Sequence, residues 1–487
     1  MFRLWNLIRA RRSLRLAQTM TRRELLALQD SRWRDLARHA LRTSPFYRRH
    51  LNGIDVNRCS LADIPPLTKP MLIEHWDDIV SEPCLRRAAL EKYLDNPANW
   101  NRLLKGRWLV CHTSGTSNIP VITPHDVASV DWLHAVHAAR NGETALARMP
   151  SPLRLFRRRP RMAVFIWENS ASASAALFHT RPWIGVLFGS YHAIDAGASW
   201  PDILNSLNQF KPNVIICYAS MLERLARAQI EGKLYLDFTA HGSSISTGGD
   251  VLTPGIRALC QQAFHLQPLD GYGCGESPAI ARQWHGVDRL MLLEDLTAFE
   301  AVDANDQPVP EGVVSDHVLV TPLINRAFPL LRYRLDDRVR LGPALAGWPF
   351  RSIDEIIGRT TMTFTFHMPE ERVVVGMNIF GIHYTDSRVV SWQARQTSPS
   401  SVECLFTPVS GTDVASLARE IQTNMRIHLD SCGCHQVEAS ARMVQFIEPD
   451  ARSGKIQQFV PLPCHQSSPP DGGQITTPVP LPQAPLF

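Results

Sequence analysis

Residues 113–120 read Thr-Ser-Gly-Thr-Ser-Asn-Ile-Pro, a run of hydroxyl side chains around one glycine. The apolar stretch Trp108–His112 before the run predicts a strand, and the apolar positions from Val127 to Val136 predict a helix after it. Glycine lets backbone N–H groups approach a ligand closely, and hydroxyl groups donate hydrogen bonds to anionic oxygens. The run therefore predicts a polyphosphate-binding loop, and a Ser/Thr turn without a ligand is the alternative.

Spacing excludes two better-known phosphate motifs. The order G-x-x-x-x-G-K-[ST] of a Walker A loop does not occur in the chain. A second glycine-rich run, Gly271-Tyr272-Gly273-Cys274-Gly275-Glu276, begins like a dinucleotide fingerprint but carries Glu276 where the third glycine belongs. Neither a P-loop nucleotide hydrolase nor a dinucleotide-binding protein is predicted.

Composition limits the class of protein further. The 487 residues are 44% hydrophobic and 20% charged, which is ordinary for a globular chain and excludes global disorder and fibres. The net charge of +5 is too small to indicate nucleic-acid binding. No apolar run approaches the ~18 residues of a spanning helix, so no transmembrane segment is expected.

The ten cysteines are scattered, and a chain of this length buries a core without disulfides. We therefore expect a reducing, cytoplasmic location. The densest group is Cys432-Gly433-Cys434-His435, for which an ordinary turn and a zinc site are the two interpretations. The zinc site needs about two more ligands, and none lies nearby in sequence.

Arginines recur through the N-terminal segment between Arg3 and Arg23, with Trp5, Leu7 and Ile8 among them. This interruption excludes a secretory signal. Two interpretations remain, a basic amphipathic helix that makes weak peripheral contact with an anionic membrane and a solvated helix packed on the domain.

Alternation of short apolar runs with helical stretches over residues 106–345 indicates βα units around a largely parallel sheet. Within them, Ser220 and Glu223 have the spacing of a capping box, with Gly232 ending that helix. Thr253 and Pro254 predict the start of a further helix. The candidate strands are Trp108–His112, Ala163–Trp167, Ile184–Phe188 and Val214–Tyr218.

The pattern changes after about residue 357. Strands are expected at Val373–Gly376, Val402–Phe406 and Val437–Ile447, with an amphipathic helix at Asp413–Leu429. We therefore predict an α/β protein with a large N-terminal domain of mixed, mostly parallel sheets at 1–357 and a small α+β domain at 358–460. The Pro-rich tail, 461–487, is expected to be extended or disordered.

Further motifs follow the loop in a fixed order. They are Ser246-Thr247-Gly248-Gly249-Asp250, the run ending at Glu276, Arg332-Tyr333-Arg334-Leu335-Asp336-Asp337, Gly358-Arg359-Thr360-Thr361 and Ser453-Gly454-Lys455. This succession resembles the adenylate-forming superfamily of acyl-CoA synthetases and adenylation domains. Residues 44–48, 64–69 and 321–333 resemble its phenylacetate–CoA ligase branch, which includes coenzyme F390 synthetase-like proteins.

The resemblance implies a role for each matching residue. ATP phosphates would bind the loop at Thr113, Ser114, Gly115, Thr116 and Ser117, and Glu276 would hold Mg²⁺. Gly248, Gly249, Asp250, Tyr272 and Gly273 would surround the adenine. Asp337 would accept from the ribose hydroxyls, Arg359 would contact the ribose–phosphate side, and Lys455, carried on a small mobile C-terminal domain, would bridge carboxylate and α-phosphate. The catalytic set would be Lys455, Glu276 and Thr116.

Each of these residues also has a plainer interpretation. Glu276 would complement a helix dipole, Asp337 would pair with Arg334 or Arg338, and Lys455 would be solvated. The chain also departs from the family pattern at Asn118, Gly275 and Thr361, where a glycine, a hydroxyl residue and a hinge aspartate are usual.

The resemblance implies ATP-dependent activation of a carboxylic acid, followed by transfer of the acyl group to the thiol of CoA. Trp167, Phe188, Tyr191 and Tyr218 are candidates for lining a pocket for an aryl or similar acid, or are core aromatics. The alternatives are an enzyme that loads an acyl carrier protein or stops at adenylation, and a non-catalytic nucleotide-binding protein. The arginines at 154, 157, 158, 159 and 161 would attract CoA phosphates or an acidic carrier, or lie in a solvated loop.

Overall fold

The computed structural model describes residues 2–113, 121–140, 160–168, 171–182, 189–240, 242–284, 286–359, 363–367, 372–376, 386, 388–431, 433–449 and 456–462. The chain divides into two compact units, residues 1–360 with 448–456 and residues 361–447 with 457–487. Within the described part, none of the helices combines the length and the apolar character needed to cross a membrane. Each unit is described by itself.

The first unit begins with helices. Local capping explains their limits, because Thr21 and Glu24 form a capping box at the start of the second helix and Ser44 caps the third. The helices are α1 (Phe2–Gln18), α2 (Arg22–Thr43), α3 (Pro45–His50), α4 (Lys69–Glu74), α5 (Trp76–Ile79) and α6 (Arg87–Leu94), with 3₁₀ turns at Leu61–Asp63 and Pro97–Asn99.

Two antiparallel strands flank the predicted phosphate loop in the sequence. The strands β1 (Leu103–Leu104), β2 (Trp108–His112) and β3 (Ile122–Asp126) form an antiparallel sheet, and α7 (Val127–Arg140) follows directly. The prediction for Trp108–His112 is confirmed, and β3 was not predicted. The loop residues 114–120 between β2 and β3 lie outside the described part of the chain.

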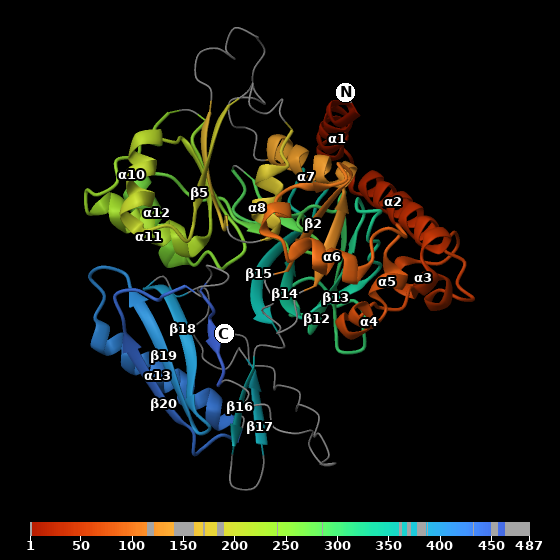
Figure 1. Ribbon diagram of the computed structural model, residues 1–487. Coiled ribbons are helices and arrows are strands. Elements are labelled where there is room, and N and C mark those ends of the chain that lie inside the picture. The colour runs from red at the N-terminus through yellow and green to blue at the C-terminus, as the bar shows by residue number, and fades with distance from the viewer. Residues whose placement is uncertain are drawn as a thin grey trace. The chain divides into compact units, whose positions relative to one another are not determined.

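The parallel part of the α/β fold is a four-stranded sheet in the order β5-β4-β6-β7. The strand predicted at Ile184–Phe188 lies outside the described residues, and the others occur within a residue or two of the expected limits. Figure 1 shows α10, α11 and α12 grouped beside this sheet. The elements are β4 (Arg161–Ile166), α8 (Ala173–His179), β5 (Ser190–Asp195), α10 (Trp200–Phe210), β6 (Val214–Cys217), α11 (Ala219–Ile230), β7 (Ser244–Thr247) and α12 (Pro254–Phe264).

Two predicted helix starts have different outcomes. Thr253 caps α12 by accepting from the Ile256 N–H, as predicted. The capping box at Ser220 is wrong, because α11 begins at Ala219 with Tyr218 as its N-cap, two residues before the predicted cap. Glu223 instead pairs with Arg227 over 3.0 Å. The spacing alone did not reveal that a distant carboxylate caps this helix.

Between α12 and the end of the first unit the strands β8 to β15 pair antiparallel, because short connections replace the helical crossovers that parallel strands need. One sheet has the order β14-β15-β10-β9-β8 and another the order β11-β12-β13. Their strands are β8 (Gly271–Tyr272), β9 (Ala281–Gln283), β10 (Leu290–Leu292), β11 (Thr297–Val302), β12 (His317–Pro322), β13 (Tyr333–Leu335), β14 (Asp337–Gly342) and β15 (Ser352–Arg359). The α/β class is confirmed with this mixed set of sheets.

The second unit combines a helix with two small sheets. Strands β16 (Thr363–His367) and β17 (Arg372–Gly376) pair with each other, and a four-stranded sheet has the order β20-β19-β18-β21. The helix α13 (Val414–Ser431) packs Leu417, Ile421 and Met425 against that sheet. The sheet strands are β18 (Val389–Ser398), β19 (Ser401–Pro408), β20 (Glu438–Met443) and β21 (Phe459–Val460); of these, β18 and β21 were not predicted.

Candidate active site

The motifs of the first unit meet where β7 and β8 approach each other. Ser246 and Leu269 form a parallel bridge, and the Thr247 N–H donates to the Leu269 carbonyl over 2.7 Å. A Cβ at position 248 would lie 3.2 Å from the Gly271 carbonyl oxygen. The two glycine-rich runs are therefore in backbone contact, and Gly248 and Gly271 are the residue type that permits this approach.

The turn after β8 presents the predicted magnesium ligand. The Cys274 N–H donates to the Ser277 carbonyl over 3.0 Å, which closes the turn around Gly275 and Glu276. A Cβ at position 273 would lie only 2.6 Å from the Pro278 carbonyl oxygen, so the turn requires glycine there. Glu276 is largely buried in this arrangement, with 8% of its surface exposed.

Tyr333 of β13 holds the Glu276 side chain. Its hydroxyl donates to Glu276 Oε1 over 3.3 Å, and the tyrosine is 1% exposed. Burial and the negative charge of Glu276 raise the pKa of Tyr333 far above its ordinary value. The phenol therefore stays protonated and acts as a donor, which leaves the second oxygen of the carboxylate available for a further partner.

The predicted adenine and ribose residues also meet. The Tyr272 hydroxyl donates to Asp337 Oδ2 over 3.0 Å, and Asp337 is 6% exposed. Asp337 lies opposite Arg359 in the β14–β15 ladder, which places these two motif residues side by side along the backbone. The plainer interpretation of Asp337 was an ion pair with Arg334 or Arg338. In the structure the Arg334 guanidinium instead lies 3.6 Å from the carboxylate of Asp336.

Thr113 lies against the Glu276 turn. It closes the base of the predicted phosphate loop, because its N–H donates to the Val121 carbonyl over 2.9 Å and its Oγ1 accepts from the Val121 N–H over 3.0 Å. A Cβ at position 275 would lie 2.6 Å from Thr113 Cγ2. The methyl group of Thr113 thus occupies the space that a side chain at position 275 would need, which is a physical reason for the departure from the family pattern.

Sequence reasoning missed a buried histidine behind this turn. His125 of β3 donates from Nε2 to the Gly275 carbonyl over 3.2 Å, and Asn325 Nδ2 donates to its Nδ1 over 3.2 Å. Burial lowers the pKa of His125, so the ring is neutral and both hydrogen bonds are satisfied by one tautomer. His125 and Asn325 therefore fix the carbonyl that directly precedes Glu276.

Asp250 has a different environment from the other predicted site residues. Its carboxylate accepts from the Ala219 N–H over 2.6 Å, the Ser220 N–H over 3.0 Å and the Ser220 hydroxyl over 2.7 Å. These are the donors at the start of α11, so Asp250 caps that helix from a distant turn. Because the Asp250 side chain is engaged in this cap, a predicted adenine wall at Gly248, Gly249 and Asp250 would consist of their backbone atoms.

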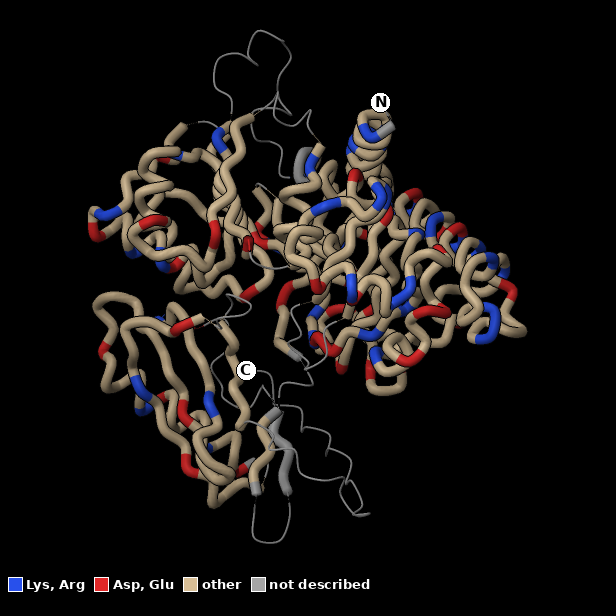
Figure 2. The backbone as a smooth tube through the Cα atoms, viewed as in Figure 1, with Lys and Arg blue, Asp and Glu red and all other residues tan. Residues whose placement is uncertain are grey.

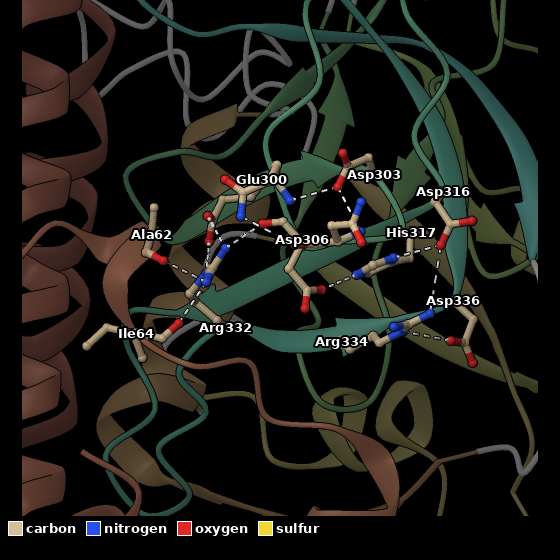
Figure 3. Close-up of polar contacts among 12 residues, drawn as sticks. Ala62, Ile64, Glu300, Asp303, Asp306, Asp316, His317, Arg332, Arg334 and Asp336 are labelled. Atoms are coloured by element: carbon tan, nitrogen blue, oxygen red, sulfur yellow. Dashed lines mark hydrogen bonds and ion pairs between the residues drawn. The ribbon is translucent and has the colours of Figure 1, made fainter. Parts of the chain in front are cut away.

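A polar network that includes Arg332 and His317 lies beside the predicted site strands, since Arg332 directly precedes β13 and His317 begins β12, which pairs with β13 (Figure 3). Arg332 is 3% exposed and donates to the carbonyls of Ala62 and Ile64 over 2.9 and 2.7 Å, and it also bonds to Glu300. His317, fully buried, lies between two carboxylates, 2.7 Å from Asp306 and 2.9 Å from Asp316. Arg332 is therefore a structural support of this region.

The predicted acid-binding aromatics are partly described. The Tyr218 hydroxyl lies 3.3 Å from Ser174 Oγ, and burial raises the pKa of this tyrosine. The Arg181 guanidinium lies 5.1 Å from the ring centre of Tyr191, and Trp167 packs against Gly197. Phe188 lies outside the described residues.

Several other predicted residues lie outside the described part of the chain. They are Ser114, Gly115, Thr116, Ser117 and Lys455, together with Thr360 and Thr361 of the expected hinge, the arginines at 154 and 157–159, and the tail from residue 463. Arg359 is described only by its backbone. Among the described residues, no three metal-binding side chains form a cluster. The predicted magnesium site therefore has one described protein ligand, the carboxylate of Glu276.

Comparison with known proteins places this geometry in context. No family model matches the chain. Among curated proteins, the Protein CapK of Staphylococcus aureus is 19% identical over 423 residues, which is 83% of each chain. The phenylacetate-coenzyme A ligases of Pseudomonas putida and Escherichia coli are 27% and 28% identical over 181 residues, which is 36% of this chain and 38% of each relative.

Two solved structures show the fold. A 2-hydroxyisobutyryl-CoA ligase in the postadenylation state, in complex with 2-HIB-AMP, superposes with a TM-score of 0.64 at 18% identity and 91% coverage of both chains. The same ligase with 2-HIB-AMP and CoA in the thioesterification state gives a TM-score of 0.53 at 17% identity, over 88% of both chains. The fold that the resemblance implies is confirmed, and the predicted similarity to phenylacetate–CoA ligases is found over 181 residues.

Proposed function

We propose that this chain, which has the adenylate-forming fold and is similar in sequence to phenylacetate–CoA ligases, activates a carboxylic acid with ATP and transfers the acyl group to CoA. The observation that carries the proposal is a pair of carboxylates that are each held by a tyrosine: Tyr333 donates to Glu276, and Tyr272 donates to Asp337. The turn that carries Glu276 also lies against Thr113, at the base of the predicted phosphate loop. The described parts of three of these motifs, those that contain Gly248, Glu276 and Asp337, are joined to one another by backbone or side-chain contacts, which supports a common site.

The chemistry has two balanced steps. A carboxylate oxygen of the acid attacks the α-phosphorus of ATP, and the bond to the β-phosphate oxygen breaks to release pyrophosphate. The CoA thiolate then attacks the acyl carbon of the adenylate, a thioester bond forms, and AMP leaves with the electron pair of the broken anhydride bond. Because charge grows on phosphate oxygens in the first step, preorganised donors and cations there lower the barrier.

The described residues have distinct roles in this proposal. Asp337 accepts from the ribose hydroxyls, with Tyr272 beside it against the base. Tyr333 orients Glu276, and His125 with Asn325 holds the preceding carbonyl. These contacts fix the carboxylates before substrate arrives, which is the condition for electrostatic catalysis without reorganisation.

The residues present fit a magnesium ion shared with ATP. Mg²⁺ is usually held by one or two carboxylates together with substrate phosphates and waters, and Glu276 supplies one carboxylate with an oxygen that Tyr333 does not occupy. When bound, the ion would neutralise charge on the phosphate oxygens. A dedicated protein cage is not required, in agreement with the absence of a three-ligand cluster in the described residues.

Other parts of the proposal rest on the sequence alone. Thr113 to Ser117 bind the phosphates, Arg359 contacts the ribose–phosphate side, and Lys455 bridges the acid and the α-phosphate. The small domain at 358–460 moves about a hinge near Arg359 between the two steps. A cytoplasmic location accords with the cysteines of the described residues, all of which are free.

Pyrophosphate release tests the acceptor. With a panel of aryl and related acids, we expect acid-dependent release from ATP, accelerated by CoA, and formation of the acyl-CoA product. Acid-dependent release that CoA never accelerates contradicts the CoA step. If an acyl carrier protein accelerates it instead, the carrier-loading alternative replaces the proposal, and release without any acceptor effect identifies an enzyme that stops at adenylation.

One observation favours a second candidate, a nucleotide-binding protein without turnover. The hydroxyl usual before the glutamate is absent at Gly275, and the Thr113 methyl fills its space. Such a protein would bind ATP with micromolar to millimolar affinity but release no pyrophosphate with any acid. Equilibrium binding of ATP measured beside the release assay separates this candidate from the enzyme.

A further inference from the structure

The N-terminal helix α1 has two apolar faces. On the inner face Ala10, Leu14 and Ala17 are fully buried and belong to a cluster with residues of α7. An ion pair of 2.8 Å joins Arg3 to the buried Asp131, which lies on α7. These contacts hold α1 as a helix on the first unit, as one of the two sequence interpretations predicts.

The outer face of α1, defined as Leu4, Trp5, Ile8, Arg9, Arg12, Arg15 and Leu16, is exposed. Trp5 is 66% exposed, and Ile8 and Leu16 are each 51% exposed. At 100° per residue these positions lie within an arc of roughly 140°, opposite the buried face. A helix that only needed solvation would place polar residues on this face, so large apolar side chains among arginines need another explanation.

The outer face of α1 is positively charged, because it carries three arginines and no acidic residue. In the part of the chain that the structure describes, no ion pair joins Arg9, Arg12 or Arg15 to an acidic side chain, and Figure 2 shows basic residues along α1. Burial and the neighbouring charge of Arg15 lower the pKa of Arg11. The arginines therefore raise the local potential and favour an anionic partner.

We propose that the outer face of α1 binds the surface of an anionic phospholipid membrane. Tryptophan is enriched at the level of lipid headgroups, because its ring is apolar and its N–H is polar. Trp5, Ile8 and Leu16 enter the boundary between headgroups and acyl chains, and the guanidinium groups contact lipid phosphates. Because the inner face is already packed on α7, α1 binds as a preformed helix and the rest of the first unit stays folded.

Charge complementarity selects a membrane over a protein groove. The apolar and basic residues are interleaved along one convex helix face, which suits a planar anionic interface where each arginine meets a phosphate. This proposal is independent of the proposed ligase activity, because none of the outer-face residues belongs to the candidate active site.

Vesicle co-sedimentation of the full chain tests the proposal. Vesicles of phosphatidylcholine with about one third phosphatidylglycerol are compared with phosphatidylcholine alone at low and high salt. Substitutions are used instead of deletion of α1, because deletion would expose the α7 face that Ala10 and Leu14 cover. The apolar variant is Trp5→Ala with Ile8→Ala, and the charge variant is Arg9→Gln with Arg12→Gln and Arg15→Gln.

Matched controls come from the same unit. Ile230→Ala with Tyr235→Ala removes side chains that are 46% and 68% exposed elsewhere, and Arg48→Gln with Arg49→Gln and Arg58→Gln removes three distant exposed cations. Thermal midpoints show that each variant folds, and analytical ultracentrifugation reports self-association.

We expect wild-type protein and both controls to sediment with anionic vesicles and to be released by salt. The charge variant should bind roughly a hundredfold more weakly, at about fivefold per arginine, and the apolar variant at least about tenfold more weakly. Wild-type protein that stays in solution with anionic vesicles at low salt overturns the proposal. So does unchanged binding in both variants, or a dimer that the apolar variant abolishes while vesicle binding is absent.

Discussion

The turns after β7 and β8 both carry glycines and one acidic residue, yet the two carboxylates have different hydrogen-bond partners. Asp250, after β7, accepts three hydrogen bonds from the start of α11. Among the described residues, Glu276 after β8 accepts one, from Tyr333. A carboxylate whose lone pairs are filled by backbone donors is a structural cap, and one held by a single phenol keeps capacity for a cation.

The sequence signal for the two acids is the same, a glycine-rich turn after a strand. Their difference arises from what lies opposite each turn, a helix N-terminus for Asp250 and the buried hydroxyl of Tyr333 for Glu276. The motif therefore locates both acids at strand ends, and tertiary contacts decide which carboxylate keeps capacity for a further partner. The predictions below test this division.

The largest expected effect is loss of turnover in Glu276→Gln. Loss of the charge that holds Mg²⁺ against the phosphates should lower acid-dependent pyrophosphate exchange by about three orders of magnitude, or roughly 4 kcal/mol. The thermal midpoint should change little, since Gln retains an oxygen for the Tyr333 hydroxyl. Exchange within a few fold of wild type would show that Glu276 is a structural acid like Asp250.

A third acidic residue, Asp270, lies between the two turns in the sequence, and its ionisation makes the stability of the protein depend on pH. Burial raises the pKa of Asp270 from 3.8 to about 6, despite nearby Arg257. The folded state therefore holds more protons than the unfolded state between these values, so stability should fall as pH rises from about 4 to about 6, by roughly 3 kcal/mol in total.

Asp270→Asn should flatten this dependence and be at least as stable as wild type at neutral pH, because Asn resembles the protonated form. Urea unfolding at a series of pH values measures both slopes. A wild-type stability that rises through the same window would contradict the buried, desolvated state of Asp270.

Asp250→Ala should show the reverse of Glu276→Gln. Removing the acceptor of three hydrogen bonds and the negative charge at the start of α11 should lower the free energy of unfolding by about 2 kcal/mol. Exchange per folded molecule should stay within a few fold of wild type. A stable variant with lost turnover would mean that the Asp250 carboxylate faces the nucleotide after all.

The smallest effect concerns the contact between Thr113 and the Glu276 turn. In Gly275→Ala the new Cβ overlaps Thr113 Cγ2, so the turn should shift and exchange should fall about tenfold. Thr113→Ser keeps the hydroxyl that accepts from Val121 and removes the methyl, so the double variant should recover most of the loss. Additive losses in the double variant would show that the two positions do not compete for space.

Local patterns predicted much of the fold. The limits of β2 and the Thr253 cap of α12 follow from apolar runs and cap chemistry within a few residues. The strand β3 was missed because its sequence, Ile-Thr-Pro-His-Asp, has no alternation, and pairing with β2 makes it a strand. Parallel and antiparallel regions could not be separated because strand partners are distant in sequence.

In the candidate site, too, residues in local motifs were predicted, and residues whose roles depend on distant contacts were missed. Glu276 and Asp337 were predicted as site residues from ordered motifs, which are short and continuous. Tyr333 was quoted in a motif without a role, and His125 had no signal, because its function depends on a contact 150 residues away with Gly275. Hydrogen bonds across such separations are set by topology, which a single sequence does not display.

Acid-dependent exchange of pyrophosphate into ATP, measured for wild type and Lys455→Ala over a broad acid panel, tests the central claim most directly. Lys233→Ala, at an exposed lysine paired with Glu231, is the matched control. We expect exchange with at least one acid in wild type and control, and a loss of orders of magnitude in Lys455→Ala with ATP binding retained. Equal and negligible exchange in all three proteins, with ATP still bound, would contradict an adenylating enzyme.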